Sequence, residues 1–173
     1  MAELHFVLGG AASGKSRYAV ARAAVLGRGL VTFIATAKAG DPELDLRIAA
    51  HRRERPPGWA TVEADEDLAI TVSNCEREHV LLIDSLTLWV AARPTGAGRA
   101  EDAWTAVEGV IAHRLPPVVL VSDEVGLGVV PDTPMGRRFR DELGRVNQRV
   151  AHGATTAVLV VAGVPLPIAS ARP

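Results

Sequence analysis

The stretch Gly9-Gly10-Ala11-Ala12-Ser13-Gly14-Lys15-Ser16 lies near the start of the chain. It matches the pattern G-x-x-x-x-G-K-[ST] of a phosphate-binding loop. The apolar run before it, residues 4–8, predicts a buried strand, and the alanine-rich run after it, residues 18–25, predicts a helix. Because the motif requires a strand, a glycine-rich loop and a helix in this order, the stretch predicts an α/β nucleotide-binding fold.

The residue types of this loop suit a polyphosphate. Glycine lets the backbone turn tightly and bring its N–H groups up to the anion, and the positive end of the following helix points at the same place. Lys15 is expected to reach the β- and γ-phosphates, and the Ser16 hydroxyl to ligate Mg²⁺. The alternative is a glycine turn that binds nothing. A dinucleotide fingerprint is excluded because it would need glycine at Ala11.

Composition sets the class of protein. With 173 residues, 48% hydrophobic and 23% charged, we expect one soluble globular domain over residues 1–173. The net charge of −1 predicts no binding to nucleic acid. Of the 19 Lys and Arg residues only Lys15 and Lys38 are lysines, so Lys15 stands out against the chain's own usage.

The cellular setting is predicted from what the sequence lacks. Cys75 is the single cysteine, so an internal disulfide is impossible and a reducing, cytoplasmic location is expected. The N-terminus does not have the pattern of a signal peptide. No apolar run approaches the roughly 18 residues of a membrane span, so we expect no membrane span.

Apolar runs alternate with helical segments along the chain. The predicted strands are residues 4–8, 30–36, 59–63, 80–84, 117–122 and 156–162, and the predicted helices after the first are 43–53, 65–74, 101–113 and 136–152. This alternation predicts a mostly parallel sheet with helices on both faces, a P-loop NTPase-like (RecA-like) fold. We expect residues 123–134 to form a long functional loop, and residues 163–173 to form a short tail.

Ligands bind beyond the carboxyl ends of strands in such sheets. Thr36 and Asp84 end predicted strands and are expected to contact the nucleotide. Asp84 is also a candidate Mg²⁺ ligand together with Ser16; the alternative is a helix N-cap before Leu86. Glu63 either touches the nucleotide or is an exposed strand residue.

A basic helix carries a candidate nucleophile. Arg47, His51 and Arg55 are spaced four residues apart and share one helix face if the helix extends that far. Neutral imidazole can attack phosphorus, and flanking arginines would stabilise charge on the phosphate. The alternatives are passive phosphate binding by His51 and a solvated basic face.

These motifs together resemble the adenosylcobinamide kinase / adenosylcobinamide-phosphate guanylyltransferase family of cobalamin biosynthesis. The resemblance covers nearly the whole chain, in order. It rests on Gly9-Gly10 with Ser13-Gly14-Lys15-Ser16, Phe33-Ile34-Ala35-Thr36-Ala37, Arg47-Ile48 with His51, Arg55, Trp59, Thr61 and Glu63, Asp84-Ser85-Leu86-Thr87-Leu88-Trp89, Glu124-Val125-Gly126 with Gly128, Val130 and Pro131, Arg138-Phe139-Arg140-Asp141 with Gly144 and Asn147-Gln148, and Ala162-Gly163-Val164-Pro165-Leu166.

The resemblance implies two reactions in one protein. A nucleoside triphosphate, GTP or ATP, with Mg²⁺ phosphorylates the aminopropanol hydroxyl of adenosylcobinamide. His51, the position that matches the family's histidine motif, then attacks the α-phosphorus of GTP and passes GMP to adenosylcobinamide phosphate. Arg47, Arg55 and Lys15 would assist catalysis. The resemblance also implies a corrinoid substrate and a homo-oligomer, a trimer.

Two positions depart from the family pattern. Ala12 stands where the family usually has arginine, which removes a cation near the phosphates, and Asp123 stands where it often has asparagine, which adds negative charge near an anionic substrate. The alternatives to the bifunctional enzyme are a monofunctional P-loop kinase of another small molecule and a nucleotide-dependent switch. A regulatory GTPase would normally read guanine with Asn-Lys-x-Asp, and this chain has no Asn-Lys pair.

Overall fold

The computed structural model describes residues 2–37, 55–64, 67–93 and 98–168. Its central element is a seven-stranded sheet in the order β3-β2-β4-β5-β1-β6-β7. The strands are β1 (Leu4–Gly9), β2 (Val31–Ala35), β3 (Ala60–Glu63), β4 (Val80–Asp84), β5 (Val118–Asp123), β6 (Thr156–Val161) and β7 (Val164–Pro167). Neighbouring strands from β3 to β6 are all parallel, and this confirms the predicted mostly parallel sheet.

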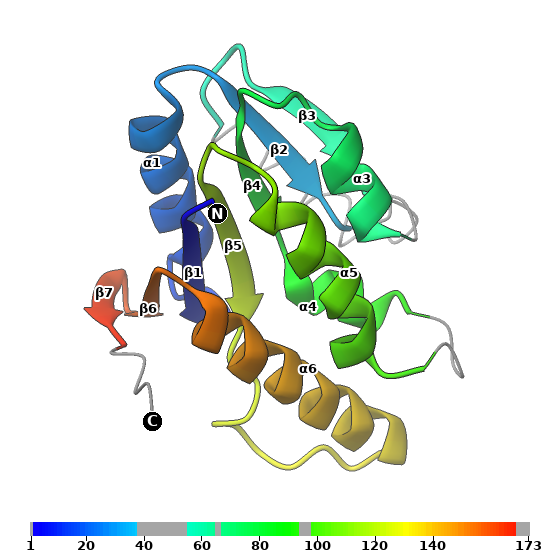
Figure 1. Cartoon of the computed structure of the whole chain (residues 1–173). Helices are drawn as coiled ribbons and strands as arrows, with labels where there is room; N and C mark the ends of the chain where they lie inside the picture. Colours follow the sequence, from blue (N-terminus) through cyan, green and yellow to red (C-terminus); the bar gives the residue numbers. More distant parts are fainter. Residues whose placement is uncertain (1, 38–54, 65–66, 94–97, 169–173) are drawn as a thin grey trace.

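Helices lie on both faces of the sheet, but unequally (Figure 1). Among the described residues, α1 (Lys15–Gly27) packs alone on one face. The other face carries α3 (Leu68–Asn74), α4 (Leu86–Ala91), α5 (Ala100–Ala112) and α6 (Pro134–Gly153). The helix predicted over residues 43–53, which includes Arg47 and His51, lies outside the described residues.

Alternation along the buried strands decides which core each side chain joins. On β4, Leu81 and Ile83 pack under α3–α6, whereas Val80 and Leu82 pack toward α1. Side chains point to opposite faces of a strand with a period of two, so a continuous apolar run fills both cores at once. The strand predictions therefore succeeded where the runs were apolar throughout.

The core beneath α3–α6 is centred on two tryptophans. Trp104 on α5 is fully buried and meets Trp89 of α4 edge to face, with ring centroids 6.2 Å apart. Edge-to-face aromatic pairs at this separation add stability beyond the area they bury. The pair therefore fixes the packing of α4 against α5 beneath the carboxyl end of β4.

The end of the chain corrects one prediction. Residues 163–173 were expected to form a tail, yet β7 (Val164–Pro167) turns back and pairs antiparallel with β6. Ala162 and Gly163 both have positive φ and make the tight turn between the two strands. The prediction was wrong because two prolines flank Leu166; β7 is an edge strand, where proline is tolerated.

In the part of the chain that the structure describes, none of the helices is long and apolar enough to cross a membrane.

Candidate functional site

The phosphate-binding loop joins β1 to α1 at the carboxyl edge of the sheet. Gly14 has φ +91°, a left-handed conformation that L side chains rarely adopt, directly before the first helical residue, Lys15. Gly9 is required for space: a Cβ there would lie 2.9 Å from the carbonyl oxygen of Val160 and closer still to Ser13 Oγ. Both glycines of the motif are therefore explained by the geometry of the loop.

The turn between β6 and β7 supports this loop from behind. The backbone N–H of Gly163 donates to the carbonyl oxygen of Ser13 at 2.8 Å. A Cβ on Gly14 would meet Gly163 Cα at 3.3 Å, so the two backbones are in close contact. The segment expected to be a tail is thus part of the wall that holds the phosphate loop in shape.

A pocket of about 520 Å³ opens in front of the loop. The phosphate loop, the ends of β2, β4 and β5 and the start of α4 all contribute to it. Its lining comprises Ala11, Ala12, Ser13, Gly14, Lys15, Ser16, Arg17, Phe33, Ala35, Ala37, Arg55, Asp84, Ser85, Leu88, Asp123, Glu124 and Val125. Its volume is in the range of pockets that bind small molecules and cofactors.

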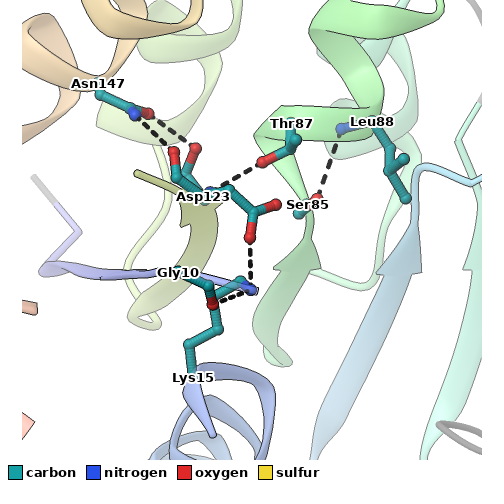
Figure 2. A network of polar contacts seen from close by, with 8 residues as sticks. Gly10, Lys15, Ser85, Thr87, Leu88, Asp123 and Asn147 are labelled. Carbon is teal, nitrogen blue, oxygen red and sulfur yellow. Dashed lines mark hydrogen bonds and ion pairs between the residues drawn. The ribbon is translucent and has the colours of Figure 1, made fainter. Parts of the chain in front are cut away.

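Lys15 points across the pocket to the end of β5 (Figure 2). Its Nζ lies 2.5 Å from Asp123 Oδ1 and donates to the carbonyl oxygen of Gly10 at 3.2 Å. Only 13% of the Lys15 side chain and 23% of the Asp123 side chain are exposed, so water screens this ion pair less than one on the surface. The ammonium group is thus held between the phosphate loop and the end of β5.

Asp123 is held through its backbone (Figure 2). Its N–H donates to Thr87 Oγ1 at 2.8 Å, and its carbonyl oxygen accepts from Asn147 Nδ2 at 3.0 Å. The fully buried Ser122 hydroxyl donates to Asn147 Oδ1 at 2.7 Å. Helices α4 and α6 thereby fix the end of β5 beside the phosphate loop.

Comparisons with known proteins show the family to which the chain belongs. A family model described as cobinamide kinase / cobinamide phosphate guanyltransferase matches residues 5–168. The chain belongs to this family. The bifunctional adenosylcobalamin biosynthesis protein CobP of Pseudomonas aeruginosa is 42% identical over 94% of the chain and 95% of the relative. The protein CobU of Escherichia coli, with the same description, is 37% identical over 91% of the chain and 95% of the relative.

Solved structures support the fold at much lower sequence identity. The flagellar accessory protein FlaH of Methanocaldococcus jannaschii superposes with a TM-score of 0.52 over 94% of this chain and 74% of FlaH, at 12% identity. An ATPase of the type III secretion system of pathogenic bacteria superposes with a TM-score of 0.56 over 91% of this chain and 50% of the ATPase, also at 12% identity. The family member described here has the P-loop NTPase fold.

Asp84 lines the pocket at the end of β4, as the motif of this family led us to expect. The alternative, in which Asp84 caps the next helix, is wrong. Ser85 is the N-cap of α4, and its Oγ accepts from the N–H of Leu88 at 3.4 Å. The cap is thus made by Ser85, and Asp84 lines the same pocket as Ser16.

Two residues predicted to contact the nucleotide, Thr36 and Glu63, are not among the described residues that line this pocket. Thr36 is buried; its hydroxyl donates to the carbonyl oxygen of Ser85 and accepts from the Ser85 N–H, both at 2.7 Å. It therefore joins the end of β2 to the start of α4. Glu63 is exposed at the end of β3 and does not line the pocket. Gly9 and Gly10 belong to the loop but are not among the residues that line the pocket.

Arg55 is the described member of the predicted basic helix; it lies in a bend and not in a helix, and it lines the pocket. Its guanidinium carbon lies 3.3 Å from the centre of the Phe33 ring, a cation–π contact that holds a positive charge beside the end of β2. Arg47 and His51 lie outside the described residues. The sequence did not single out Phe33 as a site residue, because in the sequence it looks like any other residue of a buried strand.

Proposed function

We propose that this member of the family phosphorylates adenosylcobinamide with a nucleoside triphosphate and then transfers GMP from GTP to the product, within one domain. One observation supports this most strongly: the loop amides, Lys15, Ser16, Asp84 and Arg55 all face one pocket. Two cationic side chains, a hydroxyl and a carboxylate around an anion-binding loop form the donor set that phosphoryl and nucleotidyl transfer require.

Triphosphate binding would use the loop directly. The N–H groups of residues 11–16 would surround the phosphates, and Lys15 would contact the β- and γ-phosphates. Ala12 provides no cation here, so Lys15 and Arg55 carry the positive charge of the described pocket wall together with Arg17.

Ser16 and Asp84 are the residues that would hold Mg²⁺. Both line the pocket and both offer oxygen, the donor that Mg²⁺ prefers. Mg²⁺ usually keeps waters and substrate phosphates among its ligands, so one carboxylate and one hydroxyl suffice, and no cluster of three acids or histidines is needed. When bound, Mg²⁺ would neutralise charge that develops on the phosphate oxygens.

In the kinase step the aminopropanol hydroxyl of adenosylcobinamide attacks the γ-phosphorus, and the nucleoside diphosphate leaves. Lys15 would stabilise charge on the transferred group, since it is already positioned at the loop. Positioning and electrostatic stabilisation supply most of the catalysis of such transfers.

In the guanylyl step a ring nitrogen of His51 attacks the α-phosphorus of GTP and pyrophosphate leaves. A phosphate oxygen of adenosylcobinamide phosphate then attacks the same phosphorus, which frees His51 and yields adenosylcobinamide-GDP. The family resemblance assigns His51, and it is supported by Arg55, a residue of the same motif that lines the pocket. Arg47 is proposed to stabilise phosphate charge beside it.

The chain is further proposed to act in the cytoplasm as a homo-oligomer, a trimer. The C-terminal strand and the residue after it support self-association, because their apolar side chains are exposed: Val164 by 57%, Leu166 by 47% and Ile168 by 38%. Exposed apolar surface that clusters at one edge is typical of an interaction site. Sedimentation of the pure protein tests the oligomer.

The test of the guanylyl reaction is the intact mass of the protein after incubation with GTP and Mg²⁺. We expect a gain of one GMP that is lost in acid and absent in His51→Ala. His152→Ala, which removes an exposed histidine from the last turn of α6, is the matched control and should still gain GMP. No adduct on any of the three proteins, with no pyrophosphate released, would leave a monofunctional kinase as the better assignment.

A further inference from the structure

Asp123 presents a conflict with the proposed role of Lys15. In the structure the Lys15 ammonium pairs with the Asp123 carboxylate at 2.5 Å. The proposed function, on which this inference rests, requires the same ammonium to contact the β- and γ-phosphates. A nitrogen this close to a carboxylate has to exchange at least part of that contact for phosphate oxygens. Binding of the triphosphate therefore includes the cost of opening an ion pair.

The geometry decides which partner moves. The Asp123 backbone is fixed by Thr87 and Asn147, and it pairs in register with Gly9 of β1. The next residue continues the ladder, because the Glu124 N–H donates to the Gly9 carbonyl oxygen at 3.1 Å. Lysine has a flexible four-carbon stem, whereas the carboxyl group of this aspartate is joined to a fixed backbone by a single methylene group. When triphosphate binds, the Lys15 ammonium therefore moves away, and the Asp123 carboxylate keeps its position.

We propose that Asp123 is the resident counter-ion of the empty phosphate loop and that it sets the affinity for polyphosphate. Without an anion it neutralises Lys15 in a mostly buried position. With an anion bound, a fixed negative charge remains at the wall of the pocket beside the phosphates, where like charges repel. Both effects lower the affinity for triphosphate. Asp123 therefore acts as a positioning residue for Lys15, which leaves Asp123 when it binds the substrate phosphates.

The test is calorimetric titration with two probes, GTP and inorganic tripolyphosphate, both in EDTA. Asp123→Asn removes the charge and keeps the shape and an oxygen acceptor. We expect its Kd for each probe to fall about tenfold relative to the unmodified protein. The gain should shrink as salt is added, because screening weakens both the lost pair and the lost repulsion.

Glu124 offers a matched control on the same wall. It lines the pocket, but its Oε1 accepts from the Gly126 N–H at 2.7 Å, and among the described residues the ion pair of Lys15 is with Asp123 and not with Glu124. Glu124→Gln makes the same change of net charge and should tighten binding by less than about threefold. Asp123→Glu keeps the charge and should not tighten binding. Asp123→Ala is a second neutral variant in case the asparagine variant unfolds.

Three results would overturn the proposal: binding by both neutral Asp123 variants that is no tighter than in the unmodified protein, an equal gain in Glu124→Gln, or no binding of either probe by any variant. The readout is independent of corrinoid and of His51. If Asp123→Asn binds the probes more tightly but no guanylylated protein forms, this inference is supported. The guanylyl reaction of the proposed function is then contradicted.

Discussion

The covered face of the sheet and its carboxyl edge are built from opposite kinds of residues. The face under α3–α6 is apolar and is centred on Trp104 and Trp89. The buried core cluster around these two residues contains no residue of the phosphate loop. The edge gathers Lys15, Asp84 and Asp123 around a pocket. The difference teaches that stability and chemistry are separable here: one region can be weakened while the other is kept.

The largest effect on stability is expected from substitution of Trp104 in the covered face. Trp104→Ala should lower the free energy of unfolding by about 3–5 kcal/mol, because the side chain is fully buried and the space it leaves cannot be filled. Urea denaturation measures the change. Leu115→Ala, at a side chain that is 91% exposed, is the control and should stay within about 0.5 kcal/mol. A small change in the free energy of unfolding of Trp104→Ala would mean that Trp104 is not part of the core under α3–α6.

Lys15→Ala is the opposite experiment. We expect the rate of both transfer reactions to fall about 10²–10³-fold, the usual cost of losing one donor to a developing negative charge. The variant should still unfold cooperatively, since no core side chain is removed. Arg77→Ala, an exposed cation outside the pocket, should keep full activity. A Lys15 variant that loses stability in step with activity would contradict the separation.

Asn147 connects the two regions and sharpens the comparison. Asn147→Ala removes the partner of the Ser122 hydroxyl and of the Asp123 carbonyl, and it should cost about 1–3 kcal/mol of stability. Because it also releases the end of β5, it should change the affinity for GTP, which Trp104→Phe should not. Gln148→Ala, the exposed neighbour on α6, is the control. An effect on stability alone would show that Asp123 keeps its position without Asn147.

The smallest effect is expected at His5 in β1. Burial, and then the charge of Arg22, lower the pKa of His5, although Glu3 acts in the opposite direction. As the pH falls below about 6.5, the unfolded chain takes up a proton that the folded chain resists, so stability should decrease with falling pH. His5→Asn, whose amide can replace the contact with Thr156 Oγ1, should flatten this dependence. The exposed His113→Asn should leave it unchanged, as measured by thermal unfolding between pH 5 and 7.5.

The sequence predicted those parts of the fold in which one run of residues decides the structure. The phosphate loop, the parallel strands and the long helix α6 follow from local patterns, and the structure confirms them. The β7 strand was missed because its prolines argue against a strand unless the edge position is known. For the helix after β4 the sequence analysis named only Asp84 as an alternative cap, whereas the structure has Ser85 there; adjacent Asp and Ser are both good capping residues, and only the geometry distinguishes them.

The site was predictable in so far as it lies at strand ends. Lys15, Ser16, Asp84 and Arg55 line one pocket, and their roles toward nucleotide and Mg²⁺ stay predictions. Thr36 is hydrogen-bonded to the backbone of Ser85, which the sequence did not predict, because a threonine that ends a strand can satisfy backbone groups as well as bind a ligand. The pairing of Lys15 with Asp123 could not be predicted, since it depends on β5 lying directly beside β1 in the sheet. The roles of His51 and Arg47 stay predictions.

The hydrogen bond from Gly163 to Ser13 makes the end of the chain a reporter of the pocket. Ordering of the loop by a bound triphosphate would slow solvent exchange of the Gly163 amide hydrogen, although Gly163 is not among the residues that line the pocket. The same bond limits how the protein can be engineered. A purification tag or fusion partner that pulled β7 away from β6 would loosen the phosphate loop from behind, without altering any residue that touches the nucleotide.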